Sequence, residues 1–115
     1  MTAGTYHFTI EQGSTFTRVI TYKDASGSLV NLSAHTALMH LRKKVDDSST
    51  ILELSTANGR ITLGGAAGTV TITISASDTA NLDAVEGVYD LELINGDVIE
   101  KLLAGTFTVK KEVTR

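Results

Sequence analysis

Hydrophobic and polar residues alternate along most of this chain, a pattern typical of strands that bury one face. The clearest case is TVTITIS (69–75), where Val70, Ile72 and Ile74 point one way and threonine and serine the other. In TALMHLRKK (36–44) the apolar set is Ala37, Met39 and Leu41, with His40 and Arg42 opposite; in YHFTI (6–10) it is Tyr6, Phe8 and Ile10, with His7 and Thr9 opposite. Further strands are predicted over 15–22, 50–56 and 60–63, and a short extended segment with a corner over 29–35.

A hairpin is predicted to close the chain over residues 87–109. Asn95-Gly96 in GVYDLELINGDV is a strong hairpin signal, because both residues tolerate positive φ. The register stays open. A two-residue loop places Glu100 on the face of Leu91, whereas a three-residue loop places Lys101 there.

Turn residues separate the predicted strands at short, regular intervals. Polar or glycine-containing turns fall at 11–14, 23–28 (with Gly27 left-handed), 57–59 and 64–68, and the single expected helical turn, 76–82, is capped by Ser77 or Asp78. This spacing predicts an all-β fold, an antiparallel immunoglobulin-like β-sandwich of about 7–9 short strands, with residues 1–115 as one domain. Its core is predicted to include Val70, Ile72, Ile74, Leu91, Leu93, Phe107 and Val109.

Composition narrows the function classes. The 115 residues include no Cys, so neither disulfides nor thiolate metal sites contribute. Ten Lys and Arg against thirteen Asp and Glu give a net charge of −3, which argues against nucleic-acid binding. No apolar run approaches the roughly 20 residues that cross a bilayer, and no signal-peptide pattern opens the chain, so we expect a soluble protein made in the cytoplasm, without a membrane partner.

The candidate metal ligands are scattered. His7, His35 and His40 lie on separate segments; His35 and His40 can approach each other across a corner, but solvated strand histidines are the expectation. Asp46-Asp47 lacks the repeating pattern of a calcium loop and is interpreted as a solvated turn. We therefore expect no metal site.

Candidate enzyme motifs are also weak. There is no G-x-S-x-G, and the glycine-rich LGGAAGTV (63–70) lacks the Lys-Ser or Lys-Thr ending of a P-loop and precedes a strand. We expect no catalytic residues and no cofactor. The basic runs RKK (42–44) and KK (110–111) are interpreted as charges that protect sheet edges. For a sugar-binding alternative, Tyr22 beside Asp24 is the one aromatic–carboxylate pair.

Two long stretches carry a resemblance. Residues 4–44 contain a strand, E-Q-G, an aromatic strand, a polar turn, V-N-L-S and a strand that ends in basic residues. Residues 87–115 contain Y-D-L-E-L, a glycine turn, L-L-A-G and a terminal E-V-T-R. Together these resemble small bacteriophage and prophage virion proteins, and the N-terminal domain of phage baseplate upper proteins. Baseplate upper proteins continue into further domains, so the resemblance implies a stand-alone adaptor, plug or decoration subunit here.

The resemblance implies a non-enzymatic virion structural protein, an adaptor or attachment subunit of the tail, baseplate or fibre apparatus. Head decoration and a free carbohydrate- or ligand-binding module are the alternatives. The implied partners are other virion proteins, in a symmetric homo-oligomer or ring. Because both chain ends are strand-like, we expect them to form or adjoin sheet edges, with Tyr6, Lys110, Lys111 and Arg115 contacting neighbouring subunits.

Overall fold

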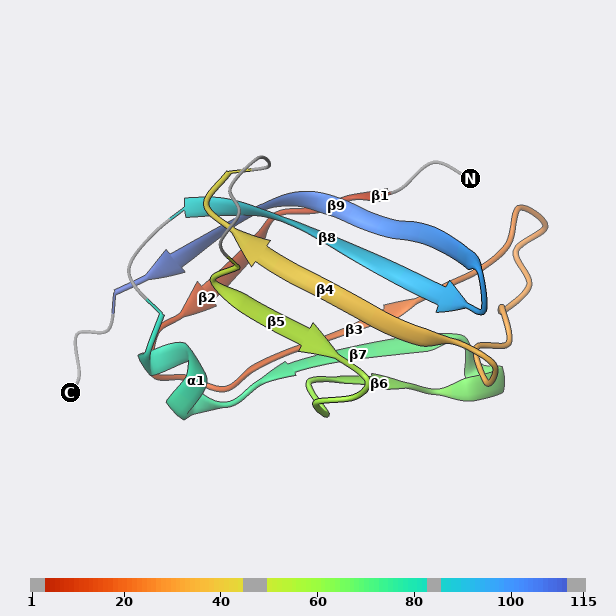
Figure 1. The fold of residues 1–115 in the computed structure, drawn as a ribbon, viewed down its shortest axis with the longest axis horizontal. Coiled ribbons are helices and arrows are strands. Elements are labelled where there is room, and N and C mark those ends of the chain that lie inside the picture. Colours follow the sequence, from red (N-terminus) through yellow and green to blue (C-terminus); the bar gives the residue numbers. More distant parts are fainter. Residues whose placement is uncertain (1–3, 45–49, 83–85, 112–115) are drawn as a thin grey trace.

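The computed structural model describes residues 4–44, 50–82 and 86–111, which form two β-sheets packed face to face (Figure 1). The predicted all-β sandwich is confirmed, with little helix. The strands are β1 (Gly4–Thr5), β2 (Phe8–Glu11), β3 (Phe16–Thr21), β4 (Thr36–Arg42), β5 (Leu52–Ser55), β6 (Ile61–Leu63), β7 (Thr69–Ile74), β8 (Glu86–Asn95) and β9 (Val98–Lys110). A 3₁₀ turn, η1 (Gly65–Ala67), and a short helix, α1 (Ala76–Ala80), complete the described elements.

The two sheets differ in size. Sheet A has the strand order β1-β9-β8-β4-β5, and β2 also pairs with β9; sheet B has the order β3-β7-β6. All pairs are antiparallel except those of β1 and β2, which run parallel to β9. The last strand of the chain therefore lies inside sheet A, and β2 forms the edge beside it.

The core between the sheets is the one that alternation predicts. Val70, Ile72, Ile74, Leu91, Leu93, Phe107 and Val109 are all at most 3% exposed, which confirms the predicted set. Ala37, Met39 and Leu41 of β4 are buried too, whereas His40 and Arg42 lie on the opposite, partly exposed face. Apolar burial of this kind is the main stabilising contribution to the fold.

The N-terminal strand departs from its prediction. Phe8 and Ile10 are buried as expected, but Tyr6 is 51% exposed, because pairing with β9 is interrupted between β1 and β2. At this break the Tyr6 carbonyl lies over Gly105 of β9, where a Cβ would stand 2.3 Å from the carbonyl oxygen. At this break the Tyr6 carbonyl also accepts a hydrogen bond from the Tyr89 hydroxyl, and the Tyr6 side chain stays outside the core.

The closing hairpin has a register that neither alternative describes fully. Asn95 pairs with Val98, so the two turn residues are Gly96, with a φ of 60°, and Asp97. Glu100 lies opposite Leu93, on the face of Leu91 that the two-residue alternative predicted. The register then shifts by one residue between Leu91 and Glu92, a β-bulge that places an extra residue in β9.

The predicted helical turn exists, but its predicted cap is wrong. The N-cap of α1 is Ser75, whose hydroxyl accepts the backbone N–H of Asp78 at 3.2 Å. Asp78 instead pairs with Arg60, with a distance of 2.9 Å between Nη2 and Oδ2, and this bond lowers the pKa of the Asp78 carboxyl. No helix among the described residues is long and apolar enough to cross a membrane.

Candidate interaction surfaces

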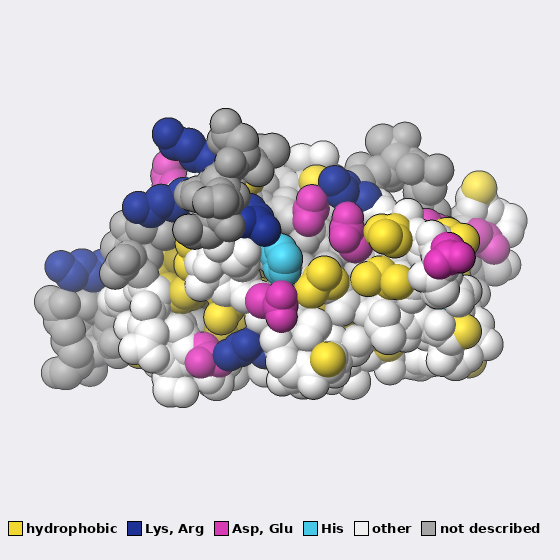
Figure 2. Space-filling view, viewed as in Figure 1, with side chains coloured by type: hydrophobic (Ala, Val, Ile, Leu, Met, Phe, Trp, Pro, Cys, Tyr) yellow, Lys and Arg dark blue, Asp and Glu magenta, His cyan; other side chains and the backbone are white. Residues whose placement is uncertain are grey.

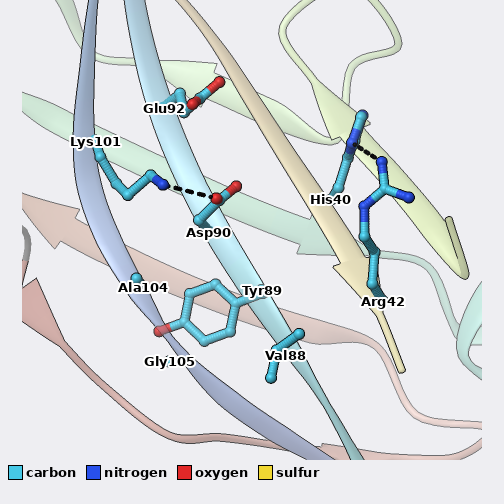
Figure 3. A pocket seen from close by; sticks show the side chains of 9 residues that line it. All are labelled: His40, Arg42, Val88, Tyr89, Asp90, Glu92, Lys101, Ala104 and Gly105. Atoms are coloured by element: carbon cyan, nitrogen blue, oxygen red, sulfur yellow. Dashed lines mark hydrogen bonds and ion pairs between the residues drawn. The ribbon is translucent and has the colours of Figure 1, made fainter. Parts of the chain in front are cut away.

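The outer face of sheet A carries a cluster of charged side chains around a shallow hollow of about 460 Å³ (Figures 2 and 3). Because alternate residues of a strand share a face, every second residue of β4, β8 and β9 projects here. The charged face comprises His40, Arg42, Glu53, Asp90, Glu92 and Lys101. Figure 2 shows hydrophobic side chains beside these charges, toward one end of the same face.

Most of the charged side chains on this face have hydrogen-bond or ion-pair partners within it. Lys101 Nζ lies 3.1 Å from Asp90 Oδ2, and this hydrogen bond and charge raise the pKa of Lys101. Arg42 Nη2 lies 3.1 Å from His40 Nδ1, and His40 Nε2 lies 3.1 Å from Glu53 Oε1. Since a guanidinium only donates, Nδ1 of His40 is the acceptor, and a neutral ring donates from Nε2 to Glu53. Lys101 therefore has a partner on the neighbouring strand β8, and Arg42 has one on its own strand, β4.

The three histidines do not converge. His7 bonds through its two ring nitrogens to Thr106 and Thr108 of β9, at 2.7 and 3.1 Å. His35 Nδ1 is buried without a hydrogen-bond partner among the described residues, and His40 belongs to the charged face. Among the described residues no group of three His, Asp or Glu side chains is placed to hold a metal ion. Asp46 and Asp47 lie outside the described residues, and the absence of a metal stays a prediction.

The aromatic–carboxylate pair proposed for sugar binding does not form. Tyr22 is 7% exposed, and its hydroxyl donates to Glu100 Oε2 at 2.9 Å. Burial, followed by the Glu100 carboxylate, raises the pKa of Tyr22 to about 12. Asp24 instead accepts bonds from Ser26 and Ser28 within its own turn, and these bonds lower its pKa. The prediction failed because alternation at the end of β3 turns Tyr22 inward.

The predicted contact residues at the chain ends lie on two parts of the surface. Tyr6 is exposed beside a mainly apolar hollow of about 310 Å³, where β1 and β2 approach β3. Lys110 and Lys111 are exposed at the end of β9, where Lys110 is in register with Glu11. Arg115 lies outside the described residues. The expectation that both end segments form or adjoin sheet edges is confirmed for the described residues: β2 forms an edge of sheet A, and β9 adjoins it while pairing with β8 on its other side.

Besides β1 and β2, the strands β3, β5 and β6 end the described sheets, and of these β3, which sequence analysis did not single out, lies beside β2. It ends sheet B, and only β7 pairs with it among the described residues. Its burial pattern breaks the alternation: after buried Phe16, the residues Thr17, Arg18 and Val19 are all exposed. In the sequence, the run T-R-V without alternation indicated an edge strand, because an edge strand at an open flank is exposed to solvent on both faces.

The edge of β2 is open on the same flank of the sandwich. We call this side, formed by β2, β3 and the residues between their sheets, the open flank. Two hollows, of about 330 and 310 Å³, lie along it, and Arg18 and its neighbours line both. Exposed apolar side chains border it, with Val19 61% exposed and Tyr6 51%.

No family model matches this sequence, and no curated protein is significantly similar to it.

Proposed function

We propose that this chain is a non-enzymatic structural subunit of a bacteriophage or prophage virion, acting as an adaptor or attachment subunit of the tail, baseplate or fibre apparatus. The observation that carries the proposal is the open flank, where β2 and β3 present two strand edges side by side with exposed Tyr6 and Val19. Strand edges and apolar borders are what a subunit buries against neighbours in an assembly.

The sequence resemblance supports the same function. The two stretches that resemble phage virion proteins, 4–44 and 87–115, contribute β1, β2, β3, β4, β8 and β9. They therefore build most of sheet A and the whole open flank. A virion subunit of this kind works by burying surface on copies of itself or on other virion proteins, in closed symmetric arrangements.

The alternatives receive less support. A head decoration protein uses the same physical means, a sandwich that buries one surface on a lattice, and differs only in its place in the particle. The sugar-binding alternative needs an exposed aromatic beside a carboxylate, and Tyr22 is buried. In the charged face the one aromatic side chain that lines the hollow, Tyr89, is itself only 4% exposed.

The test is quantitative mass spectrometry of phage particles induced from a host that carries this gene and purified on a density gradient. We expect the chain in the particle fraction in a fixed ratio to the major capsid protein. A chain recovered only from the particle-free lysate, in a preparation where the capsid and tail proteins are found, would show that the proposal is wrong.

A further inference from the structure

At every second residue of β3, the backbone N–H and C=O groups point away from β7, the one strand that pairs with β3 among the described residues. Tyr22 N–H donates to the Gly68 carbonyl at 2.7 Å, which fixes the residues of β3 that bond to β7. On the far side of β7, Thr73 N–H donates to Arg60 and the Thr69 carbonyl accepts from Gly64, both at 2.8 Å.

In an antiparallel pair, the N–H and C=O of one residue point to the same side. Thr69, Thr71 and Thr73 therefore bond toward β6, and their register partners Thr21, Val19 and Thr17 direct their backbone groups to the open flank.

Arg18 stands in the middle of this edge and faces the space between the sheets. Its register partner is Ile72, which is fully buried, so the Arg18 side chain projects on the core-facing side of sheet B. There its guanidinium carbon lies 4.6 Å from the centroid of the Phe16 ring, and Nη1 donates to the Thr17 carbonyl at 2.8 Å. Among the described residues no carboxylate lies within ion-pair distance of Arg18.

This cation makes the edge selective. An inward-facing charge on an edge strand discourages arbitrary strand pairing, because an apolar partner would cover the charge without compensating it. A strand that carries a carboxylate opposite Arg18 supplies the compensation in a bidentate geometry. Two positions away on the same face, Ile20 and the apolar hollow with Tyr6 and Leu103 accept an apolar side chain.

We propose that the open edge of β3 binds an extended segment of a neighbouring protein as an added antiparallel strand, with an acidic residue opposite Arg18 and an apolar residue opposite Ile20. The residue opposite Val19 exchanges two backbone hydrogen bonds with it and is β-branched, to pack on the exposed Val19 side chain. The inference rests on the proposed function for the identity of the neighbouring protein. The chemistry of the bound segment is inferred from the geometry of β3.

The probe is a capped synthetic peptide, Ser-Thr-Ile-Thr-Glu-Thr-Ser, in which Ile, Thr and Glu stand opposite Ile20, Val19 and Arg18. Titrated into the purified chain and followed by amide NMR, it is expected to shift the amide signals of residues 17–21 and to slow hydrogen exchange at Val19. Replacing its Glu by Lys should weaken binding at least about tenfold, because a like charge then faces Arg18. Arg18→Glu in the protein should reverse this preference.

Two matched changes test the backbone pairing. Val19→Pro removes an N–H that points away from β7, so no hydrogen bond within sheet B is lost, and peptide binding should be abolished. Val19→Thr keeps this N–H and should retain peptide binding. If Val19→Pro does not fold, N-methylation of the peptide Thr opposite Val19 removes the reciprocal donor in the unchanged protein.

The inference is overturned if the peptide does not bind, if the Glu and Lys peptides bind equally, or if the N-methylated peptide binds as well as its parent. It is also overturned if sedimentation shows a dimer that Arg18→Glu or Val19→Pro dissociates, because a second copy then occupies the edge. These results do not depend on phage particles, so they are distinct from a failure of the proposed virion role.

Discussion

The hydroxyl of Tyr89 donates a 2.6 Å hydrogen bond to the backbone carbonyl of Tyr6, across 83 positions of sequence. This bond holds the break between β1 and β2 against β9, with Gly105 beneath it. Since Tyr89 is 4% exposed, the hydroxyl donates inside the sandwich at the border of the open flank. The fixed position of Tyr6 gives that flank one of its walls.

Tyr89→Phe should lower the free energy of unfolding by about 1–2 kcal/mol, because the Tyr6 carbonyl loses its donor from the buried Tyr89 hydroxyl. Urea unfolding followed by circular dichroism measures the change. Tyr6→Phe is the matched control, since it removes a hydroxyl from a half-exposed side chain, and it should change stability by less than about 0.5 kcal/mol. Equal effects of the two variants would contradict the role of this bond.

Gly105→Ala should destabilise the chain by about 1–3 kcal/mol, the usual cost of forcing extra volume into a packed site. The added Cβ would stand 2.3 Å from the Tyr6 carbonyl oxygen, which is backbone and cannot rotate away. Lys110→Ala, at an exposed position of the same strand, should be nearly neutral. Thermal unfolding of both variants distinguishes the crowding from a general intolerance of β9 to substitution.

Ile72→Ala should cost about 2–5 kcal/mol, through lost burial and the cavity left in the core. Ile72 is fully buried at the centre of sheet B, between its register partners Arg18 and Ile61. Val19→Ala removes apolar atoms from an exposed site on the adjoining strand and serves as the control. A loss below about 0.5 kcal/mol for Ile72→Ala would mean that the face assignment of β7 is wrong.

Stability should fall as pH rises from about 10 to about 12. Burial raises the pKa of Tyr89 to about 12, and burial with the Glu100 carboxylate does the same for Tyr22, above the ordinary value of 10.0. A pKa raised by folding means that the folded state keeps its proton longer. The stabilisation is therefore complete below pH 10 and is lost as pH approaches the folded-state value.

Urea midpoints measured across this range test the pH dependence. The variant with both Tyr22→Phe and Tyr89→Phe removes the two titrating groups and should show a shallower decline above pH 10. A decline of the same steepness in wild type and double variant would assign the alkaline loss to other groups.

Lys110→Glu combined with Lys111→Glu should reduce incorporation into particles if the C-terminal contact exists, while the fold is kept. Both side chains are exposed, and the backbone bond from Gln12 N–H to the Lys110 carbonyl, 2.9 Å long, is unaffected by the change. Deleting residues 110–115 would remove that bond as well, so the charge reversal is the cleaner variant. Immunoblots of purified particles measure incorporation, and a melting curve of the free chain checks the fold. Unchanged incorporation would contradict the proposed C-terminal contact.

Much of the fold was predictable from alternation because half-buried strands impose a period of two. The faces of β4, β7 and β8 follow directly from it, as does the core. Tyr6 was misassigned because the same alternation continues through a break that depends on Tyr89 and Gly105, both distant in sequence. The hairpin register could not be predicted, because the bulge in β9 depends on tertiary packing.

The proposed interaction surface was harder to predict than the fold. Edges are properties of strand order, and strand order is set by which segments pair over long distances. The chain ends were predicted to form or adjoin edges because they are strand-like, and β1, β2 and β9 do so, whereas the edge strand β3 lies within the chain and was not predicted. The cation Arg18 among apolar neighbours marks the edge only after its register with Ile72 is known.

Hydrogen exchange of the chain, free and within purified phage particles, tests the central claim most directly. The amides of Val19 and Thr21 point to the open flank and should exchange rapidly in the free chain, then become protected in the particle, while those of Arg18 and Ile20, bonded to β7, change little. Absence of the chain from the particles, or exchange in β3 that is the same in both states, would contradict the claim that this sandwich serves a virion through its open flank.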